Sequence, residues 1–175
     1  MNLDNLEIER LSGSLGAEVR GLSLDECTAE DAETIRSLLL EHQVLFFPEQ
    51  RLNPDTHIAF GRLFGELEAH PNLSFGAERP EFFELHAAGG QGAIADEWHS
   101  DLTCQDEPSL YAILNMVKCP SFGGDTMWAN TAAAYEALSP AMRDFLEGLR
   151  ALHDAHGHDK PQQMAMHPVV RVHPV

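Results

Sequence analysis

The chain has 175 residues and a formal net charge of −17, because 28 acidic side chains outnumber 11 basic ones. A chain of this length can build one domain with its own hydrophobic core and is too short to argue for two. The negative charge argues against a nucleic-acid partner, since phosphate binding needs a basic face. It also opposes long-range attraction of anionic substrates, so an anion site would have to rely on local cationic groups.

The N-terminus and the cysteines indicate the compartment. The segment Met1–Asp4 lacks the charged and apolar regions of a signal peptide, and no apolar run approaches membrane-spanning length. The three cysteines are odd in number and lack the spacing of a metal site: Cys27, Cys104 and Cys119. They are typical of reduced thiols, so we predict a cytoplasmic protein with no membrane partner.

The first part of the chain predicts short strands followed by a capped helix. Residues 6–26 are typical of short strands around a turn at Ser12-Gly13. Thr28 is a suitable N-cap, and apolar side chains then recur at helical spacing to about His42.

A buried strand and a second helix are expected next. Residues 44–47 form a continuously apolar run that Pro48 ends, which favours a buried strand. Asn53 as a cap and Pro54 at the first helical position begin the second helix, which we expect to end at Gly65.

The middle of the chain predicts a long loop and further strands. Residues 71–96 are rich in glycine and proline, which favours a loop around one strand at 82–86 and makes this stretch a candidate lid or substrate loop. Strands are also predicted at 110–117 and, after the turn at Gly123-Gly124, at 126–128.

Two helices and a polar tail complete the prediction. Asn130 can cap a helix that runs through Leu138, and Ser139-Pro140 opens another. In the latter, four apolar side chains share one face: Met142, Phe145, Leu146 and Leu149. The tail from Ala155 is polar and rich in histidine, and then extended at 169–172.

The segment Trp98-His99-Ser100-Asp101 is the most informative stretch of the sequence. In a strand, side chains alternate between faces, so His99 and Asp101 would point the same way. One imidazole nitrogen and one carboxylate oxygen could then occupy adjacent positions on a metal ion. Two histidines and one carboxylate on one face are the ligand set of non-haem Fe(II) oxygenases. A His-x-Asp pair also arises by chance, so its context matters.

The pair stands among several other informative blocks. The block Gly123-Gly124-Asp125-Thr126-Met127-Trp128 follows it about twenty residues on. The other blocks are residues 16–22, 44–47, 97–103, 131–139 and 167–171. Together they span nearly the whole chain, and in order and spacing they resemble the TauD/TfdA family of 2-oxoglutarate-dependent dioxygenases.

The resemblance implies an α+β fold built on a double-stranded β-helix, or jelly roll, with α/β elements at the N-terminus and a helical insert. In the family, the second half of the barrel follows the block at His167. The resemblance therefore predicts that residues 1–175 form a single dioxygenase-type domain that is truncated at its C-terminus, with an incomplete barrel.

The resemblance also assigns roles to individual residues. His99 and Asp101 would bind Fe(II), and Thr126 would donate its hydroxyl to the distal carboxylate of 2-oxoglutarate. His70 would contact the anionic head of the substrate. The implied reaction uses O₂ to hydroxylate a small organic anion, with succinate and CO₂ as co-products.

The sequence departs from the family pattern at the substrate side. Taurine-oxidising members carry a tyrosine and an asparagine where this chain has Leu73 and Ala95. Neither residue can make the missing hydrogen bonds, so we expect another sulfonate, a sulfate ester or a carboxylate as substrate instead of taurine.

The family's second histidine ligand, and the arginine that pairs with 2-oxoglutarate, would lie beyond Val175. An internal replacement ligand would have to come from the later histidines: His153, His156, His158, His167 or His173. Two rival interpretations stay open: a degenerate family member acting as a non-enzymatic binding domain, and a cupin-like hydrolase with Zn²⁺ at the same pair. Assembly into a homo-oligomer is also left open.

Overall fold

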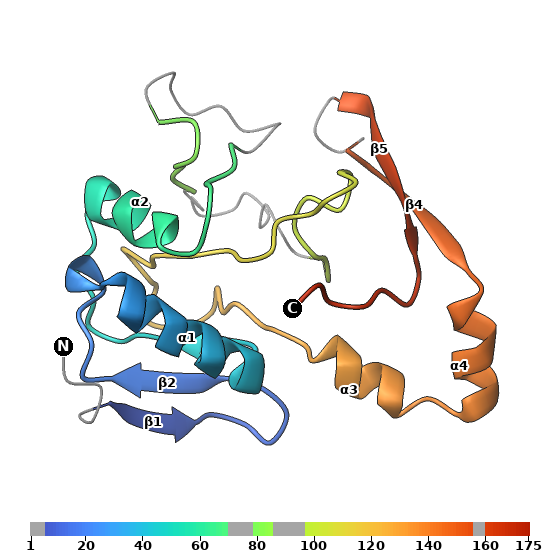
Figure 1. The fold of residues 1–175 in the computed structure, drawn as a ribbon, viewed down its shortest axis with the longest axis horizontal. Coiled ribbons are helices and arrows are strands. Elements are labelled where there is room, and N and C mark those ends of the chain that lie inside the picture. The colour runs from blue at the N-terminus through green and yellow to red at the C-terminus, as the bar shows by residue number, and fades with distance from the viewer. Residues whose placement is uncertain (1–5, 70–78, 86–96, 156–159) are drawn as a thin grey trace. The chain divides into compact units, whose positions relative to one another are not determined.

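The computed structural model divides the chain into two compact units (Figure 1). The structure describes residues 6–69, 79–85, 97–155 and 160–175. The first unit comprises residues 1–66, 113–143 and 174–175, and the second comprises residues 67–112 and 144–173.

A three-stranded sheet forms the base of the first unit, with strand order β1-β2-β3. Strand β1 (Glu7–Arg10) pairs antiparallel with β2 (Ala17–Arg20), and β2 pairs in parallel with β3 (Leu45–Phe46). The backbone N–H of Leu11 donates to the carbonyl of Gly16 at 2.9 Å and closes the connecting turn. The predicted strands and turn are thus confirmed, although β3 is shorter than the apolar run at 44–47.

The first long helix begins where its cap predicted. Helix α1 (Ala29–His42) lies beside the sheet in Figure 1. The hydroxyl of Thr28 accepts from the backbone N–H of Asp31 at 3.3 Å, while the Asp31 carboxylate accepts from the backbone N–H of Thr28 at 2.8 Å. This reciprocal pair satisfies two N–H groups that a helix start otherwise leaves without partners.

Helix α2 (Pro54–Arg62) is capped in the same reciprocal way by Asn53 and Thr56. It ends at Arg62, before the predicted end at Gly65. The chain there tightens, since Leu63 and Phe64 donate to carbonyl groups only three residues back.

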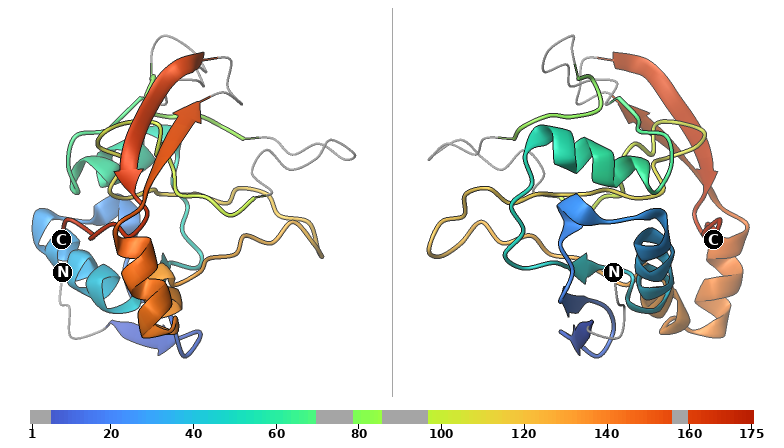
Figure 2. Two further views of the ribbon diagram at one scale, coloured as in Figure 1. Left: turned by 90° about the vertical axis from the view of Figure 1, so that its right-hand side faces the viewer. Right: turned by 60° about the vertical axis from the view of Figure 1, so that its left-hand side comes forward.

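The core of the first unit lies between α1, α2 and the 3₁₀ turn at Leu24–Glu26. Figure 2 shows the ribbon of these elements from two further sides. Four buried side chains form its centre: Leu22, Leu24, Ile35 and Phe60. Burial of such apolar groups contributes on the order of 1.5–3 kcal/mol for each large side chain. This cluster therefore accounts for why these segments, far apart in sequence, stay together.

The two later helices of the chain are shorter than predicted. Asn130 caps α3 (Thr131–Glu136), as its position suggested. Helix α4 (Pro140–Glu147) follows at Ser139-Pro140, but its apolar face is largely exposed in the described part of the chain. Phe145, for example, is 63% exposed.

Three predicted strands are absent from the described residues. The segments 82–85, 110–117 and 126–128 contain no assigned strand, and His86 lies outside the described residues. A strand exists only where a neighbouring strand completes its hydrogen-bond ladder, and these segments have no such neighbour among the residues described. Large apolar side chains remain exposed along them, as at Leu114, Met116 and Val117.

A hairpin in the second unit was not predicted. Strand β4 (Arg150–Ala155) pairs antiparallel with β5 (Lys160–Pro168), and β5 lies where we expected a polar tail from Ala155. Buried and exposed side chains alternate along β4 and along residues 163–168 of β5. The more buried face carries Ala151, His153, Ala155, Ala165 and His167, whereas the exposed face carries Leu152, Met164 and Met166.

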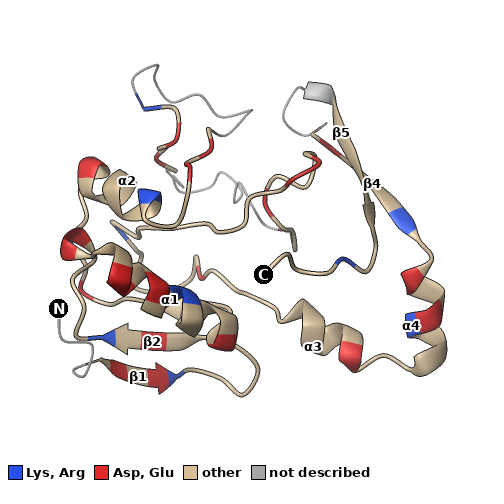
Figure 3. Cartoon of the chain, in the orientation of Figure 1, with Lys and Arg blue, Asp and Glu red and all other residues tan. Residues whose placement is uncertain are grey.

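Acidic side chains dominate the charged surface, as Figure 3 shows along α1. The ion pair between Arg10 and Glu41 measures 2.6 Å, but both side chains are mostly exposed. Such exposed pairs contribute little to stability. None of the helices in the described ranges combines the length and apolar character needed to span a membrane.

Replacing Thr28 by alanine should lower the free energy of unfolding at pH 7 by about 1 kcal/mol, because the cap is lost. Hydrogen bonds from Thr28, first from its backbone N–H and then from its hydroxyl, hold the pKa of Asp31 below its ordinary value of 3.8. The stability that these hydrogen bonds give to the folded protein is present above pH 3.8 and is lost as the pH falls through the lower, folded-state pKa of Asp31.

The loss in free energy of unfolding caused by Thr28→Ala should therefore become smaller in strong acid. Urea unfolding of the variant and the parent protein at several pH values measures this loss. Thr34→Ala is the matched control, since it removes a hydroxyl from the middle of the same helix and should be neutral or slightly stabilising. Equal stability of Thr28→Ala and the parent protein would contradict the capping role.

Candidate metal centre

The segment that holds the candidate ligands is an extended stretch followed by a turn. Residues 98–100 carry no strand pairing, and the turn begins at Asp101, so the strand predicted here is absent. Leu102 has a φ of 53°, in the left-handed region that residues other than glycine rarely adopt. The backbone N–H of Gln105 donates to the carbonyl of Leu102 at 3.0 Å and closes this turn.

The turn brings the two candidate ligands together even without a strand. The Nε2 atom of His99 lies 3.3 Å from Oδ1 of Asp101. Two ligand atoms each about 2.1 Å from one metal ion, at a right angle, stand roughly 3.0 Å apart. The side chains are 50% and 57% exposed, so further ligands can approach them. A nitrogen and a carboxylate oxygen at this separation fit adjacent positions on one divalent metal ion.

A hydrogen bond to the backbone orients the imidazole ring. Nδ1 of His99 lies 2.7 Å from the carbonyl oxygen of Glu97. A carbonyl oxygen only accepts, so Nδ1 carries the proton, and in the neutral ring Nε2 keeps its lone pair. Metal-binding histidines regularly donate their second N–H to a carbonyl or carboxylate in this way. The nitrogen that faces Asp101 is thus the one able to bind a metal.

The described residues contain no third ligand beside the pair: nowhere in the described ranges do three His, Cys, Asp or Glu side chains gather as a metal site requires. Nε2 of His167 instead lies 2.9 Å from each of the carbonyl oxygens of Thr103 and Gln105. Nδ1 of His153 lies 3.0 Å from Oγ1 of Thr103. Both histidines therefore contact the turn that follows Asp101.

His70, Leu73, Ala95, His156 and His158 all lie outside the described residues. Their roles stay predictions. His173 lies in the C-terminal tail, beyond β5.

Thr126 lies in the first unit, in an extended segment whose ends are tied to that unit. The ring of Trp128 meets Phe46 of β3 edge to face, with centroids 5.2 Å apart. The side chain of Asn130 accepts from the N–H of Ala133 at 2.9 Å and donates to the carbonyl of Ser14 at 2.9 Å. The Thr126 hydroxyl is exposed between a turn and these two anchors, so it is available as a donor to a ligand.

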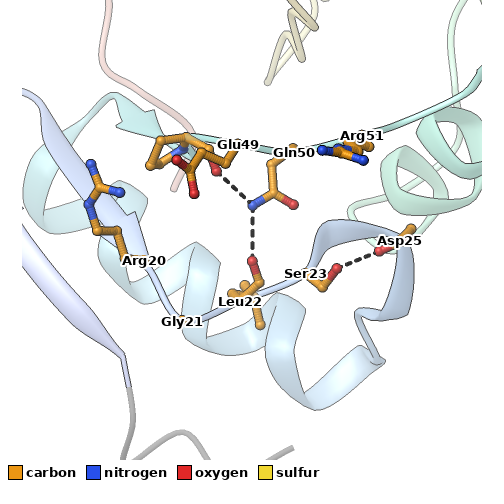
Figure 4. Close-up of a pocket in the computed structure, with 9 residues that line it drawn as sticks. Arg20, Gly21, Leu22, Ser23, Asp25, Glu49, Gln50 and Arg51 are labelled. Atoms are coloured by element: carbon orange, nitrogen blue, oxygen red, sulfur yellow. Dashed lines mark hydrogen bonds between the residues drawn. The ribbon is translucent and has the colours of Figure 1, made fainter.

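A separate depression of about 540 Å³ opens in the first unit (Figure 4). Gln50 spans it, donating to the carbonyl groups of Leu22 at 3.0 Å and Pro48 at 3.1 Å, and accepting from the N–H of Leu24. These bonds already satisfy its amide group. The depression includes none of the predicted site residues, and we interpret it as the space around a structural glutamine.

The thiol of Cys27 is not suited to nucleophilic chemistry. Cys27, Cys104 and Cys119 are free thiols. Burial, assisted by the charges of Asp31 and Asp25, raises the pKa of Cys27 to about 11, so its thiol is neutral and a poor nucleophile.

Comparison with known families decides the affiliation. The model of the "Taurine catabolism dioxygenase TauD, TfdA family" matches residues 7–175, nearly the whole chain. The chain belongs to the TauD/TfdA family. The predicted resemblance is therefore confirmed, and the solved structures of TauD-type proteins have the jelly-roll fold that it implied.

Individual TauD/TfdA relatives match almost all of this chain. An alpha-ketoglutarate-dependent sulfate ester dioxygenase of Pseudomonas putida is 34% identical, with 97% of this chain and 63% of the relative covered. An alkylsulfatase of Acinetobacter baylyi is 36% identical, with 97% and 60% covered. A taurine dioxygenase structure from Burkholderia xenovorans superposes with a TM-score of 0.82 at 36% identity, with 97% and 59% covered. The chain thus spans about three fifths of the length of these relatives.

Substitutions at Asn130 test how the Thr126 segment is held. Asn130→Ala removes both the helix cap and the bond to Ser14, and should lower the free energy of unfolding by about 1–2 kcal/mol. Asn130→Asp keeps the accepting oxygen and loses only the donor, so it should cost less than half as much. Denaturant unfolding gives both values. Indistinguishable losses for the two variants would show that the bond to Ser14 carries most of the effect.

Proposed function

We propose that this protein is an Fe(II)- and 2-oxoglutarate-dependent dioxygenase that hydroxylates a small organic anion, with succinate and CO₂ as co-products. One observation carries the proposal: the free nitrogen of His99 and the carboxylate of Asp101 lie 3.3 Å apart in an accessible turn. Membership of the TauD/TfdA family supports the same chemistry. Imidazole and carboxylate are the protein ligands of non-haem Fe(II) oxygenases.

Each candidate residue has a distinct task in this proposal. Bound iron supplies the oxidative chemistry, in which 2-oxoglutarate is decarboxylated as O₂ is consumed. His99 and Asp101 hold the metal on one side and leave its other positions accessible. Thr126 donates its hydroxyl to the distal carboxylate of 2-oxoglutarate, a directional contact that adds no charge.

The substrate class follows from the relatives and from the departures in this sequence. The relatives are described as acting on a sulfate ester, on sulfonates and on 2,4-dichlorophenoxyacetate, all of them organic anions. Leu73 and Ala95 cannot replace the polar groups that taurine-oxidising members use. We therefore favour a sulfate ester or a sulfonate other than taurine, with His70 at its anionic head.

The proposal places the remaining iron ligand outside the described residues. His153 and His167 hold the turn after Asp101, so neither fits the role of replacement ligand. The relatives are longer than this chain, and we propose that a region like their remaining part supplies the third ligand and the arginine for 2-oxoglutarate. The same region would complete the barrel around the exposed apolar segment 110–117.

Replacing Asp101 by alanine should abolish metal-dependent succinate release in the complete enzyme, because it removes the anionic ligand of the pair. Asp106→Ala is the matched control, since it removes an exposed carboxylate from the same unit and should keep the parent rate. Succinate is measured with Fe(II), 2-oxoglutarate and a panel of alkyl sulfates and sulfonates. Parent-like decarboxylation by Asp101→Ala would show that the metal binds elsewhere.

The metal used in this assay separates the rival functions. Activity with Zn²⁺ but without 2-oxoglutarate would favour a cupin-like hydrolase. Substrate binding without turnover in the complete protein would favour a degenerate binding domain.

The chain of residues 1–175 alone should turn over 2-oxoglutarate far more slowly than a chain extended by the reading frame after codon 175. Its exposed apolar segments should also promote self-association, because uncovered apolar surface and free strand edges pair with other molecules. Succinate release and sedimentation velocity, measured side by side, test both points. A monomeric short chain with the activity of the long one would contradict the proposal and require another source for the third ligand.

A further inference from the structure

The turn that carries Asp101 is strained. Leu102 follows Asp101 directly and holds a φ of 53°, although it has a branched side chain and no special tolerance for this region. Such a conformation persists only where the surroundings enforce it. The hydrogen bond from the N–H of Gln105 to the carbonyl of Leu102 is a single local contact. A further constraint is therefore needed to hold Leu102 in this conformation.

His167 supplies that constraint. Its ring Nε2 lies 2.9 Å from the carbonyl oxygen of Thr103 and 2.9 Å from that of Gln105. Both partners only accept, so Nε2 must be the donor, and one N–H is shared between them. His167 is 7% exposed, so water does not readily replace these bonds. The imidazole thus fixes two of the three residues that follow Leu102.

The neighbouring strand fixes the ring of His167 itself. Its partner in the β-ladder is Ala151 on β4, and His153 lies on the same face of that strand. The rings of His153 and His167 meet at 72° with centroids 5.4 Å apart. Nδ1 of His153 also contacts Oγ1 of Thr103 at 3.0 Å. The turn is therefore held to the hairpin at three points, all within the second unit.

We propose that His167 is a positioning residue for the metal pair: by holding the strained turn at Leu102, it keeps the Asp101 carboxylate beside Nε2 of His99. This inference rests on the proposed function, because it presumes that the pair binds a metal. The physical reason is that a two-atom ligand geometry tolerates only about 0.5 Å of displacement before affinity falls. Without its donor, the turn has two partly buried carbonyl groups that lose a partner, and it relaxes away from the left-handed conformation.

The test compares two substitutions of the same residue. His167→Leu removes the donor, whereas His167→Gln keeps an N–H donor near the position of Nε2. The probe is Co²⁺, titrated into the apoprotein and followed by its ligand-field absorption, with activity playing no part. We expect His167→Leu to weaken Co²⁺ binding roughly 10-fold to 100-fold. His167→Gln should restore most of the affinity.

A second measurement in the metal-free protein reports on the turn itself. Amide hydrogen exchange at Gln105 should accelerate at least tenfold in His167→Leu and remain near the parent rate in His167→Gln. Met166→Leu is the matched control, since Met166 occupies the opposite, exposed face of the same strand and should change neither value. Circular dichroism of the hairpin confirms that each variant is folded.

The outcomes separate this inference from the proposed function. Co²⁺ affinity of His167→Leu within twofold of the parent protein, with binding still lost in Asp101→Ala, would overturn the positioning role and leave the metal site standing. Equal Co²⁺ binding by the parent protein and Asp101→Ala would overturn both. Weak binding by His167→Leu and His167→Gln alike would also overturn the inference, because it would show that packing and not the donor matters.

Discussion

The candidate site depends on one short hydrogen bond, from Nδ1 of His99 to the carbonyl oxygen of Glu97 at 2.7 Å. It fixes the proton on the nitrogen that faces away from Asp101 and turns the other nitrogen toward the carboxylate. Without it, the neutral ring would be free to rotate, or to carry its proton on Nε2 and donate to Asp101. A bond between residues this close in sequence thus selects the metal-binding form of the histidine.

The two units hold their candidate residues in different ways. In the first unit, the Thr126 segment is anchored by an aromatic contact at Trp128 and by both halves of the Asn130 amide. In the second unit, the ligand turn is bound to the β4–β5 hairpin through the buried His167 and the partly buried His153. Neither set of contacts involves the Thr126 hydroxyl or the Asp101 carboxylate, so these exposed groups stay available.

The sequence predicted the elements whose signals are local. Thr28 and Asn53 predicted the starts of their helices, because a cap and its partner lie within one turn of each other. The strands predicted at 110–117 and 126–128 are absent, because a strand depends on a partner that is distant in sequence and that no local signal reveals. The β4–β5 hairpin was missed because its more buried face carries alanines and histidines and its exposed face carries Leu152, Met164 and Met166, the reverse of the usual pattern. A sequence motif was enough to identify His99 and Asp101. The contacts of His167 with the turn became visible only in the folded structure.

Diffraction at an X-ray wavelength chosen for Mn²⁺ tests the central claim most directly. Mn²⁺ is a redox-stable stand-in for Fe(II), and its anomalous signal locates it in a crystal of the protein without reference to activity. The account predicts an anomalous peak about 2.1–2.2 Å from both Nε2 of His99 and a carboxylate oxygen of Asp101, with Nδ1 still bonded to Glu97. A peak at any other cluster of side chains, or Asp101 and His99 joined only by a hydrogen bond in saturating Mn²⁺, would contradict it.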